Sequence, residues 1–373
     1  MEDDGDYGIG QKSSARDVSP ASAIELPYRP RDPQNYRPAI GLIGCGGISE
    51  MHLRAYENAG YAVVALCSRN RERAEARRRE FFPDADIYPD YRDLLARADI
   101  EVVDITTHPQ ERVPIIEAAI DAGKHILSQK PFVVDLDIGL RLLERADARG
   151  VLLAVNQNGR WAPHFSYLRH ALKADLLGTL CSAHFSVHWD HSWIAGTTFE
   201  DVADLVLYDF GIHWFDMAAA LLAGRTVLSV YASAARSPAQ NVRPALLAQV
   251  AIECEDAQVG LFFNGYTQQG QRDSTYVVGT QGSFESTGPD LTTQSVALYT
   301  SGGIMRPELE GTWFGAGFHG AMAELLCAIA EKREPEHGAR NNLESLALCF
   351  AAVASARSGQ SFCPGQVRRL PGG

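Results

Sequence analysis

The chain has 373 residues, of which 46% are hydrophobic and 21% charged, and its formal net charge is −12. This length exceeds most single hydrophobic cores, so we expect two domains, and the composition excludes a disordered or fibrous chain. The acidic balance argues against a nucleic-acid partner, because binding to phosphates needs a clustered positive face. The acidic start, MEDDGDYGIG, and the lack of a long apolar run predict a cytoplasmic protein without a membrane-spanning segment.

The first 38 residues are rich in Pro, Ser, Asp and Arg and show no hydrophobic period. Such a segment cannot bury enough apolar surface to order itself, so residues 1–38 are predicted to form a flexible arm or an arm lying on another surface. Folding is expected to begin at Ala39.

From Ala39 the chain alternates short apolar runs with longer helical ones, a pattern typical of a parallel sheet wrapped by helices. The sequence therefore predicts a doubly wound dinucleotide-binding domain over 39–156. The expected strands are 39–45, 61–68, 85–88, 101–107, 125–130 and 151–157, and the expected helices are 49–60, 71–80, 91–98, 113–123 and 135–149.

After Gly178 the strands become longer and alternate apolar with polar residues, which favours a mostly antiparallel sheet with one open face. Residues 157–373 are predicted to form an α+β domain for substrate binding and oligomerisation, whose last helices pack back on the first domain. A large open apolar face predicts a homo-oligomer, either a dimer or a tetramer. The expected strands are 179–193, 225–236, 246–256, 258–267 and 274–287, with helices around 205–217, 319–332 and 342–358.

The segment GLIGCGGIS places Gly44, Gly46 and Gly47 between a predicted strand and a predicted helix. In that context the glycines make a tight turn and let the backbone approach a pyrophosphate at the helix N-terminus. Ser49 stands at the third glycine position of the motif and is small enough for close helix packing. The alternative is a glycine turn that serves packing alone.

The second strand ends in Cys67-Ser68-Arg69-Asn70 and offers no acid for a ribose hydroxyl. Because Arg holds a phosphate through two parallel hydrogen bonds, Ser68 and Arg69 favour NADP over NAD. Stacking of Arg69 on the adenine is the alternative, and it leaves NAD open.

The run LVLYDFGIHWFDM, from Leu205 to Met217, carries Asp209, His213 and Asp216 at helical spacing, so the three side chains are expected to share one face. They either satisfy one another at the edge of a core or line an active site. We expect Asp216 to be a partner of His213 or of the backbone rather than a catalytic group.

Seven cysteines occur singly, without disulfide or zinc-ligand spacing, and are expected to be reduced core residues. Along the predicted strand from Ala183 to Trp193, alternation places His184, His188 and Asp190 on the same side. No thiolate supports a metal site there, so no metal is predicted. The other side carries Phe185, Val187, Trp189, His191 and Trp193.

Four motifs, GCGGIS, AGKHILSQKP, NGRWAP and DFGIHWFD, occur in the order and approximate spacing found in the Gfo/Idh/MocA family, the glucose-fructose oxidoreductase and inositol dehydrogenase group. The chain resembles that family from about Ala39 to Gln360. The resemblance implies an NAD(P)-dependent oxidoreductase that transfers a hydride between a nicotinamide and a secondary alcohol or ketone of a sugar, inositol or related polyol.

By this resemblance Lys130 matches the lysine of the family's Glu-Lys-Pro triplet, and Asp209 and His213 match its aspartate and histidine four residues apart. Oxidation of an alcohol needs a base and a cation beside the developing alkoxide. We expect His213, oriented by Asp209, to be the base and Lys130 the cation, although a desolvated lysine can exchange roles with it.

Gln129 and Arg112 depart from the family pattern, which usually has Glu and His at these positions. The expected cofactor-binding residues are Gly44, Gly46, Gly47, Ile48, Ser68, Arg69, Thr106, Thr107, Gln129 and Lys130. The expected substrate-binding residues are Asn158, Arg160, Trp161, Trp189, His191, Trp193 and His213. The alternative for the strand aromatics is a core or subunit contact, and the alternative for Arg160 is a salt bridge between domains.

Two other functions remain open for this sequence. One is a redox-assisted glycosidase or lyase that holds its NAD(P) tightly and regenerates it. The other is a cofactor-sensing regulatory protein that lost the chemistry, for which Gln129 is the only support.

Overall fold

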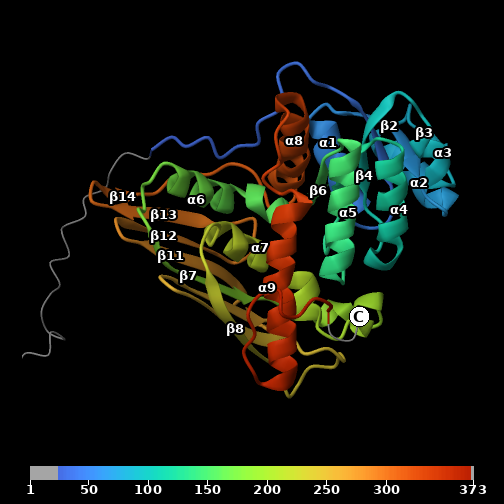
Figure 1. Ribbon diagram of the computed structural model, residues 1–373. Coiled ribbons are helices and arrows are strands. Elements are labelled where there is room, and N and C mark those ends of the chain that lie inside the picture. Colours follow the sequence, from blue (N-terminus) through green and yellow to red (C-terminus); the bar gives the residue numbers. More distant parts are fainter. Residues whose placement is uncertain (1–23, 371–373) are drawn as a thin grey trace, which may run out of the picture.

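The computed structural model describes residues 24–370, which form two sheets joined through helices (Figure 1). The first sheet has six strands in the order β3-β2-β1-β4-β5-β6, all parallel. This confirms the predicted doubly wound fold. Its strands are β1 (Ala39–Ile43), β2 (Ala62–Cys67), β3 (Asp86–Tyr88), β4 (Ile100–Ile105), β5 (His125–Ser128) and β6 (Leu153–Val155).

Helices cover both faces of the parallel sheet. One face packs against α1 (Ser49–Asn58), α2 (Arg71–Phe81) and α8 (Gly315–Glu331), whose buried side chains share one apolar core with β1 and β2. The other face packs against α3 (Tyr91–Leu95), α4 (Pro109–Asp121) and α5 (Leu136–Arg149). Helix α8, from the end of the chain, thus lies beside α1.

The second sheet has eight strands in the order β14-β13-β12-β11-β7-β10-β9-β8. Only the β7–β10 pair is parallel, which confirms the expected mostly antiparallel sheet. Its strands are β7 (Leu180–His188), β8 (Val227–Ala235), β9 (Leu247–Cys254), β10 (Gln258–Asn264), β11 (Arg272–Gly279), β12 (Gly282–Gly288), β13 (Ser295–Thr300) and β14 (Gly303–Met305).

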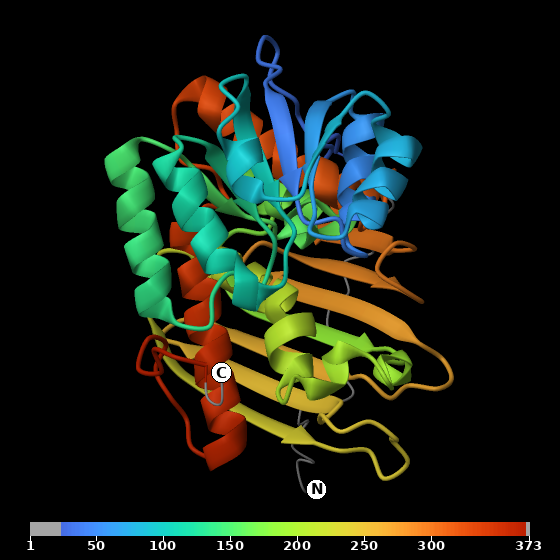
Figure 2. The same ribbon diagram turned by 90° about the vertical axis from the view of Figure 1, so that its right-hand side faces the viewer.

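One face of this sheet is covered by α6 (Pro163–Lys173), α7 (Ile212–Leu221) and α9 (Ala339–Ser358), and Figure 2 shows α9 crossing the strands below the first domain. The opposite face is open. It exposes large apolar side chains, with 48% of Tyr231 and 44% of Tyr276 accessible, together with Phe262.

Several elements differ from the predictions. Strand β7 ends at His188, and Trp193 lies in a 3-10 helix, Ser192–Ile194, so the predicted alternation along 179–193 stops early. Helix α6 and strands β13 and β14 were not predicted. Among the cysteines, Cys181 and Cys363 are exposed rather than buried in a core, and Cys181 is the residue that the pairing of β7 with β11 skips at a β-bulge.

Part of the predicted N-terminal arm is ordered on the chain's own surface, whereas residues 1–23 lie outside the described part. Leu26 is buried, and Ser166 on α6 donates a hydrogen bond of 2.6 Å to the carbonyl of Tyr28. Further along, Asp32 accepts a hydrogen bond from Tyr61 and lies 3.1 Å from Nε2 of His319 on α8. Residues 24–38 therefore link α6 and α8 to the start of β2, an inner strand of the parallel sheet (Figure 1).

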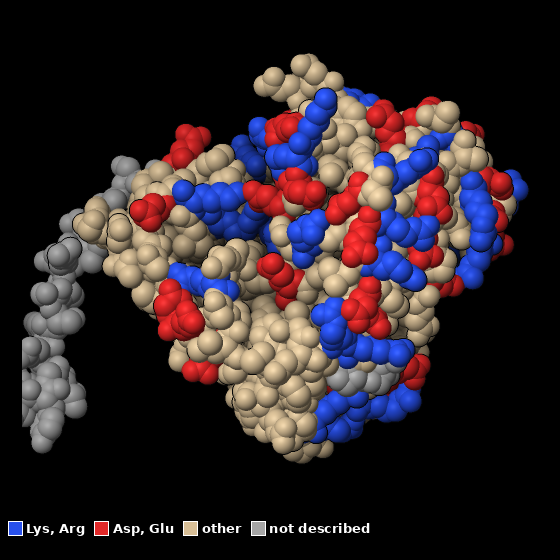
Figure 3. Space-filling view, in the orientation of Figure 1, with Lys and Arg blue, Asp and Glu red and all other residues tan. Residues whose placement is uncertain are grey.

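Acidic and basic side chains alternate over α4 and α5 on the face seen in Figure 3. Arg145, for example, pairs with both Glu117 and Asp121. Within residues 24–370, no helix combines the length and the apolar character needed to cross a membrane.

Candidate active site

The glycine turn between β1 and α1 leaves backbone surface free at the start of α1. Gly44 has φ +110°, and a Cβ atom there would lie 2.9 Å from the amide nitrogen of Thr107, so only glycine fits. A Cβ atom at Gly46 or Gly47 would meet nothing within 4 Å. The fully buried Ser49 donates a hydrogen bond of 2.6 Å to the carbonyl of Gly46, which closes the turn against the helix.

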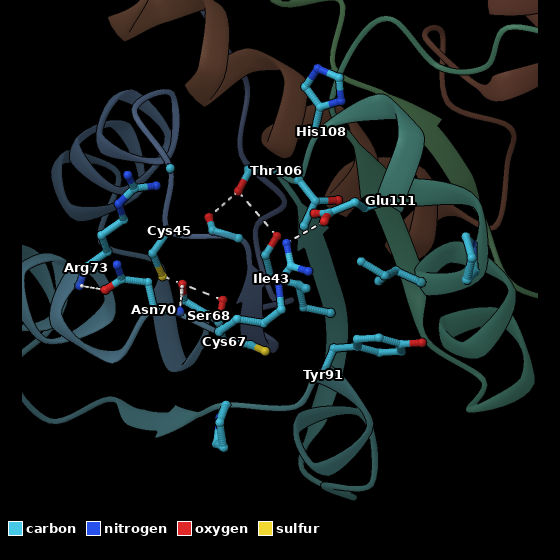
Figure 4. Close-up of a pocket in the computed structure, with 17 residues that line it drawn as sticks. Ile43, Cys45, Cys67, Ser68, Asn70, Arg73, Tyr91, Thr106, His108 and Glu111 are labelled. Carbon is cyan, nitrogen blue, oxygen red and sulfur yellow. Dashed lines mark hydrogen bonds and ion pairs between the residues drawn. The ribbon is translucent and has the colours of Figure 1, made fainter. Parts of the chain in front are cut away.

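A pocket of about 660 Å³ opens beside this turn, at the carboxyl ends of β1, β2 and β4 (Figure 4). Six of the predicted cofactor-binding residues line it: Gly44, Gly46, Ser68, Arg69, Thr106 and Thr107. Gly47 and Ile48 lie at the start of α1, and Gln129 and Lys130 follow β5, outside the lining of this pocket.

Sequence reasoning missed part of the lining, mainly Asn70, Arg73, Tyr91, His108 and Glu111. All five follow the carboxyl ends of β2, β3 or β4, where ligands of doubly wound folds bind, so strand order was the available signal. Asn70 caps α2 by accepting the amide of Arg73 at 3.0 Å.

The pocket fits a dinucleotide. Its bare glycine backbone lies at a helix N-terminus, where a pyrophosphate binds favourably. Beside it Ser68, Arg69 and Arg73 provide a hydroxyl and two guanidinium groups, and Arg69 forms an ion pair across the pocket with Glu111.

A contact between Lys130 of the first domain and Asp209 of the second joins the two domains. The ammonium of Lys130, just after β5, donates to the carbonyl of Asp209 at 2.9 Å and lies 3.5 Å from its Oδ1. Both side chains are only partly exposed. Asp209 belongs to a π-helical turn, Val206–Phe210, in which the amide of Gly211 bonds to the carbonyl of Val206 at 2.7 Å. Such turns occur frequently at functional sites.

His213 is held neutral. Burial and the nearby charge of Lys130 lower the pKa of His213 well below 6.5, and its Nδ1 has no partner among the described residues. The ring of Trp313 packs edge-to-face against the imidazole of His213, with 5.4 Å between the ring centroids. The prediction that Asp209 orients His213 is corrected, because no hydrogen bond joins them and Asp209 contacts Lys130 instead. Asp209 lies in the π-helical turn and His213 in the α-helix that follows, so the two side chains are not placed as they would be four residues apart in a regular α-helix.

Arg112, one of the two departures from the family pattern, is buried and holds two strand ends together. It donates to the carbonyl of Thr107 at 2.6 Å and to the carbonyl of Pro131, the residue after Lys130. Burial lowers the pKa of Arg112 to about 10.

The predicted strand aromatics gather around Phe210, the residue after Asp209. The ring centroid of His191 lies 4.1 Å from that of Phe210, and burial lowers the pKa of His191 to about 4. Trp189 and His191 line a cavity of only about 10 Å³, whereas Trp193 is 54% exposed. Trp193 is thus the member of this group that is available to a ligand.

Three predicted substrate contacts are instead part of the core. Arg160 is buried and pairs with Asp216 at 2.5 and 2.8 Å, so its guanidinium is used within the second domain. Asn158 is buried and donates to the carbonyl of Trp313 at 3.2 Å. Trp161 is buried against α8, where a Cβ atom on Gly320 would overlap its ring. Asp216 has a structural partner, as expected, but that partner is Arg160 and not His213.

Residues 39–157 match the model of an oxidoreductase family with an NAD-binding Rossmann fold, and residues 165–285 match the GFO/IDH/MocA C-terminal domain. D-apiose dehydrogenase from Paraburkholderia graminis is 26% identical over 86% of this chain and 88% of its own length. Inositol 2-dehydrogenase from Burkholderia multivorans is 28% identical over 79% of this chain and 94% of its own length.

Solved structures share the whole fold. An oxidoreductase from Agrobacterium radiobacter, solved with NAD+, L-tartaric acid and magnesium, superimposes with a TM-score of 0.78 at 20% identity, covering 88% of this chain and 99% of its own. A levoglucosan dehydrogenase solved with NADH and levoglucosan gives a TM-score of 0.76 at 19% identity, covering 88% and 100%. Both halves of the chain match, and the chain belongs to the GFO/IDH/MocA family of NAD-binding oxidoreductases.

Proposed function

We propose that this protein transfers a hydride between NAD(P) and a secondary alcohol or ketone of a sugar, inositol or related polyol. The observation that carries the proposal is the meeting of Lys130, from the dinucleotide-binding domain, with Asp209 from the second domain, close to the neutral His213. The relatives named D-apiose dehydrogenase and inositol 2-dehydrogenase support this substrate class.

The three side chains divide the proton chemistry. His213 accepts the hydroxyl proton, since burial and the nearby charge of Lys130 lower the pKa of its imidazole well below 6.5 and leave it neutral. Lys130 places its ammonium beside the reacting oxygen and stabilises the developing negative charge. Asp209 holds that ammonium through both its carbonyl and its carboxylate. When bound, the nicotinamide supplies the carbon that takes up the hydride.

Trp193 offers an exposed apolar ring for the C–H face of a sugar, next to Phe199 and Phe210. Arg160, Asn158 and Trp161 act on the substrate only through packing, since their side chains are buried elsewhere.

We propose NADP as the preferred cofactor. Ser68, Arg69 and Arg73 lie at the end of the pocket where β2 ends, and the carboxylate on its lining, Glu111, already pairs with Arg69. A 2′-phosphate can take the place of that carboxylate on the guanidinium. Arg69→Ala should therefore raise KM for NADP about tenfold or more, with a smaller effect on KM for NAD.

The decisive experiment supplies a panel of sugars and cyclitols with each cofactor and follows nicotinamide absorbance. Lys130→Met should lower kcat about 100-fold or more while the protein still binds cofactor. A substrate consumed without net absorbance change would instead favour a redox-assisted lyase or glycosidase. Cofactor binding without any turnover, in wild type and Lys130→Met alike, would favour a regulatory protein.

We further propose that the protein is a cytoplasmic homo-oligomer that assembles through the open face of the second sheet. We also propose that the boundary between its two domains lies near residues 156 and 157. The exposed side chains of Tyr231, Tyr276 and Phe262 support the assembly. Tyr231→Glu combined with Tyr276→Glu should shift the molecular mass measured by light scattering to that of a monomer.

A further inference from the structure

A fully buried polar network lies behind the glycine turn and ends at Lys130. His52 on α1 is inaccessible to solvent, and its Nδ1 lies 2.7 Å from Oδ2 of Asp104 on β4. Tyr56, one helical turn later, donates its hydroxyl to the same Oδ2 at 2.7 Å. Since a carboxylate only accepts, Nδ1 of His52 carries the proton and Nε2 presents a lone pair.

That lone pair faces two side-chain amides. Nε2 of His52 lies 3.2 Å from the amide nitrogen of Gln129 and 3.1 Å from that of Asn156. With its NH₂ group directed to His52, Gln129 has its oxygen left to accept the backbone amide of Lys130, at 2.7 Å. The imidazole thereby fixes which way the Gln129 amide points.

Asp104 and Tyr56 are the titratable groups that face His52 from β4 and from its own helix. Gln129 and Asn156 face it with neutral amides. The ring of Phe318 on α8 also packs against His52, with 4.3 Å between the ring centroids. The network thus contains a single carboxylate, which lies on the Nδ1 side of the imidazole.

We propose that Asp104, His52 and Gln129 act as positioning residues that orient the backbone of Lys130, and that Gln129 is a glutamine because Asp104 already supplies the only carboxylate the network can hold. This inference rests on the proposed role of Lys130 in hydride transfer. The ammonium end of Lys130 is held by Asp209, and the backbone end is held by this network.

The proposal predicts how each single substitution fails. Gln129→Glu places a second buried carboxylate against the imidazole lone pair, and His52 then takes up a proton to relieve the repulsion. Its kcat should fall about tenfold at alkaline pH, where that proton is lost, and recover toward acid pH. In Asp104→Asn, His52 can adopt either neutral tautomer, so the side-chain amide of Gln129 can rotate by 180°. The kcat of this variant should also fall about tenfold, with little pH dependence.

The double variant Asp104→Asn/Gln129→Glu moves the single carboxylate from one side of the ring to the other. His52 stays neutral, donates from Nε2 to Glu at 129, and accepts at Nδ1 from Asn at 104. Its kcat should therefore exceed that of either single variant. The matched control is Asp104→Asn/Gln157→Glu, which adds a buried carboxylate one residue beyond Asn156 and should give no rescue.

A second readout is independent of turnover. Nitrogen NMR of histidine-labelled wild-type protein should show His52 protonated at Nδ1 and unprotonated at Nε2, with the signal assigned by its loss in His52→Asn. In the double variant the two nitrogens should exchange these states. If wild-type turnover is absent but the NMR result holds, the proposed function fails while the network stands.

The proposal would be overturned if the kcat of the double variant were about 100-fold below that of the wild type, which is the product of the two single losses. A wild-type His52 protonated at Nε2, or a Gln129→Glu enzyme with the kcat and pH profile of the wild type, would also overturn it. Melting temperatures of all variants, measured alongside, separate unfolding from loss of positioning.

Discussion

Replacing Arg160 tests whether this residue serves the substrate or the fold. The structure buries its guanidinium, with only 6% of the side chain exposed, against an Asp216 side chain that is 2% exposed. Arg160→Met removes both bonds to Asp216, at 2.5 and 2.8 Å, and leaves a buried carboxylate whose remaining side-chain donor is Ser345 at 3.0 Å. An unpaired buried charge of this kind costs about 3–5 kcal/mol.

For a domain of this size, about 3–5 kcal/mol corresponds to a fall in melting temperature of roughly 6–20 °C. The double variant Arg160→Met/Asp216→Leu removes both charges and should regain most of that loss, because no unpaired charge remains. Differential scanning calorimetry measures both variants, and KM for the sugar is followed at 20 °C. An Arg160→Met protein that melts like the wild type but shows a much higher KM would refute the structural role and restore the substrate contact.

Three further outcomes follow from the described geometry. Gly44→Ala should destabilise the protein by about 1–3 kcal/mol in urea unfolding because its backbone is left-handed, whereas Gly46→Ala should keep that stability and weaken cofactor binding measured by fluorescence titration. Arg112→Met should lower kcat more than it raises KM for NADP, because it frees the segment after Lys130; equal changes would count against this reading. Burial lowers the pKa of His164 to about 3, so between pH 6.5 and about 3 only the unfolded chain binds that proton and stability falls as pH falls. His164→Phe should flatten this slope by about 1.4 kcal/mol per pH unit in urea unfolding at pH 5 and 6; an unchanged slope would contradict it.

The parallel sheet could be predicted closely because most of its strands are short apolar runs followed by a helix, and several of these helices carry their own start or stop signals. Asn70 and Asp135 cap α2 and α5, and Gly150 ends α5 in the left-handed conformation. These signals are local in sequence, so no tertiary contact is needed to read them.

The contacts within the site were harder to predict because they depend on residues far apart in the chain. The expected contact of Asp209 with His213 assumed α-helical spacing, and nothing in the residues DFGIH marks the π turn. Arg160 was assigned to the substrate because it follows the last predicted strand of the dinucleotide-binding domain, whereas its partner Asp216 lies 56 residues away in sequence. Trp313, which packs on His213, stands in a glycine-rich segment without a helical or strand period.

The bond from Lys130 to the main-chain carbonyl of Asp209 has a consequence for making chimaeras of related enzymes. A carbonyl cannot be restored by choosing a side chain, so a transplanted second domain must reproduce the backbone path of Val206–Phe210 and not only an aspartate. Grafts joined after β6 that carry this turn intact should keep the lysine in place, whereas a donor with an uninterrupted helix there should leave its ammonium displaced.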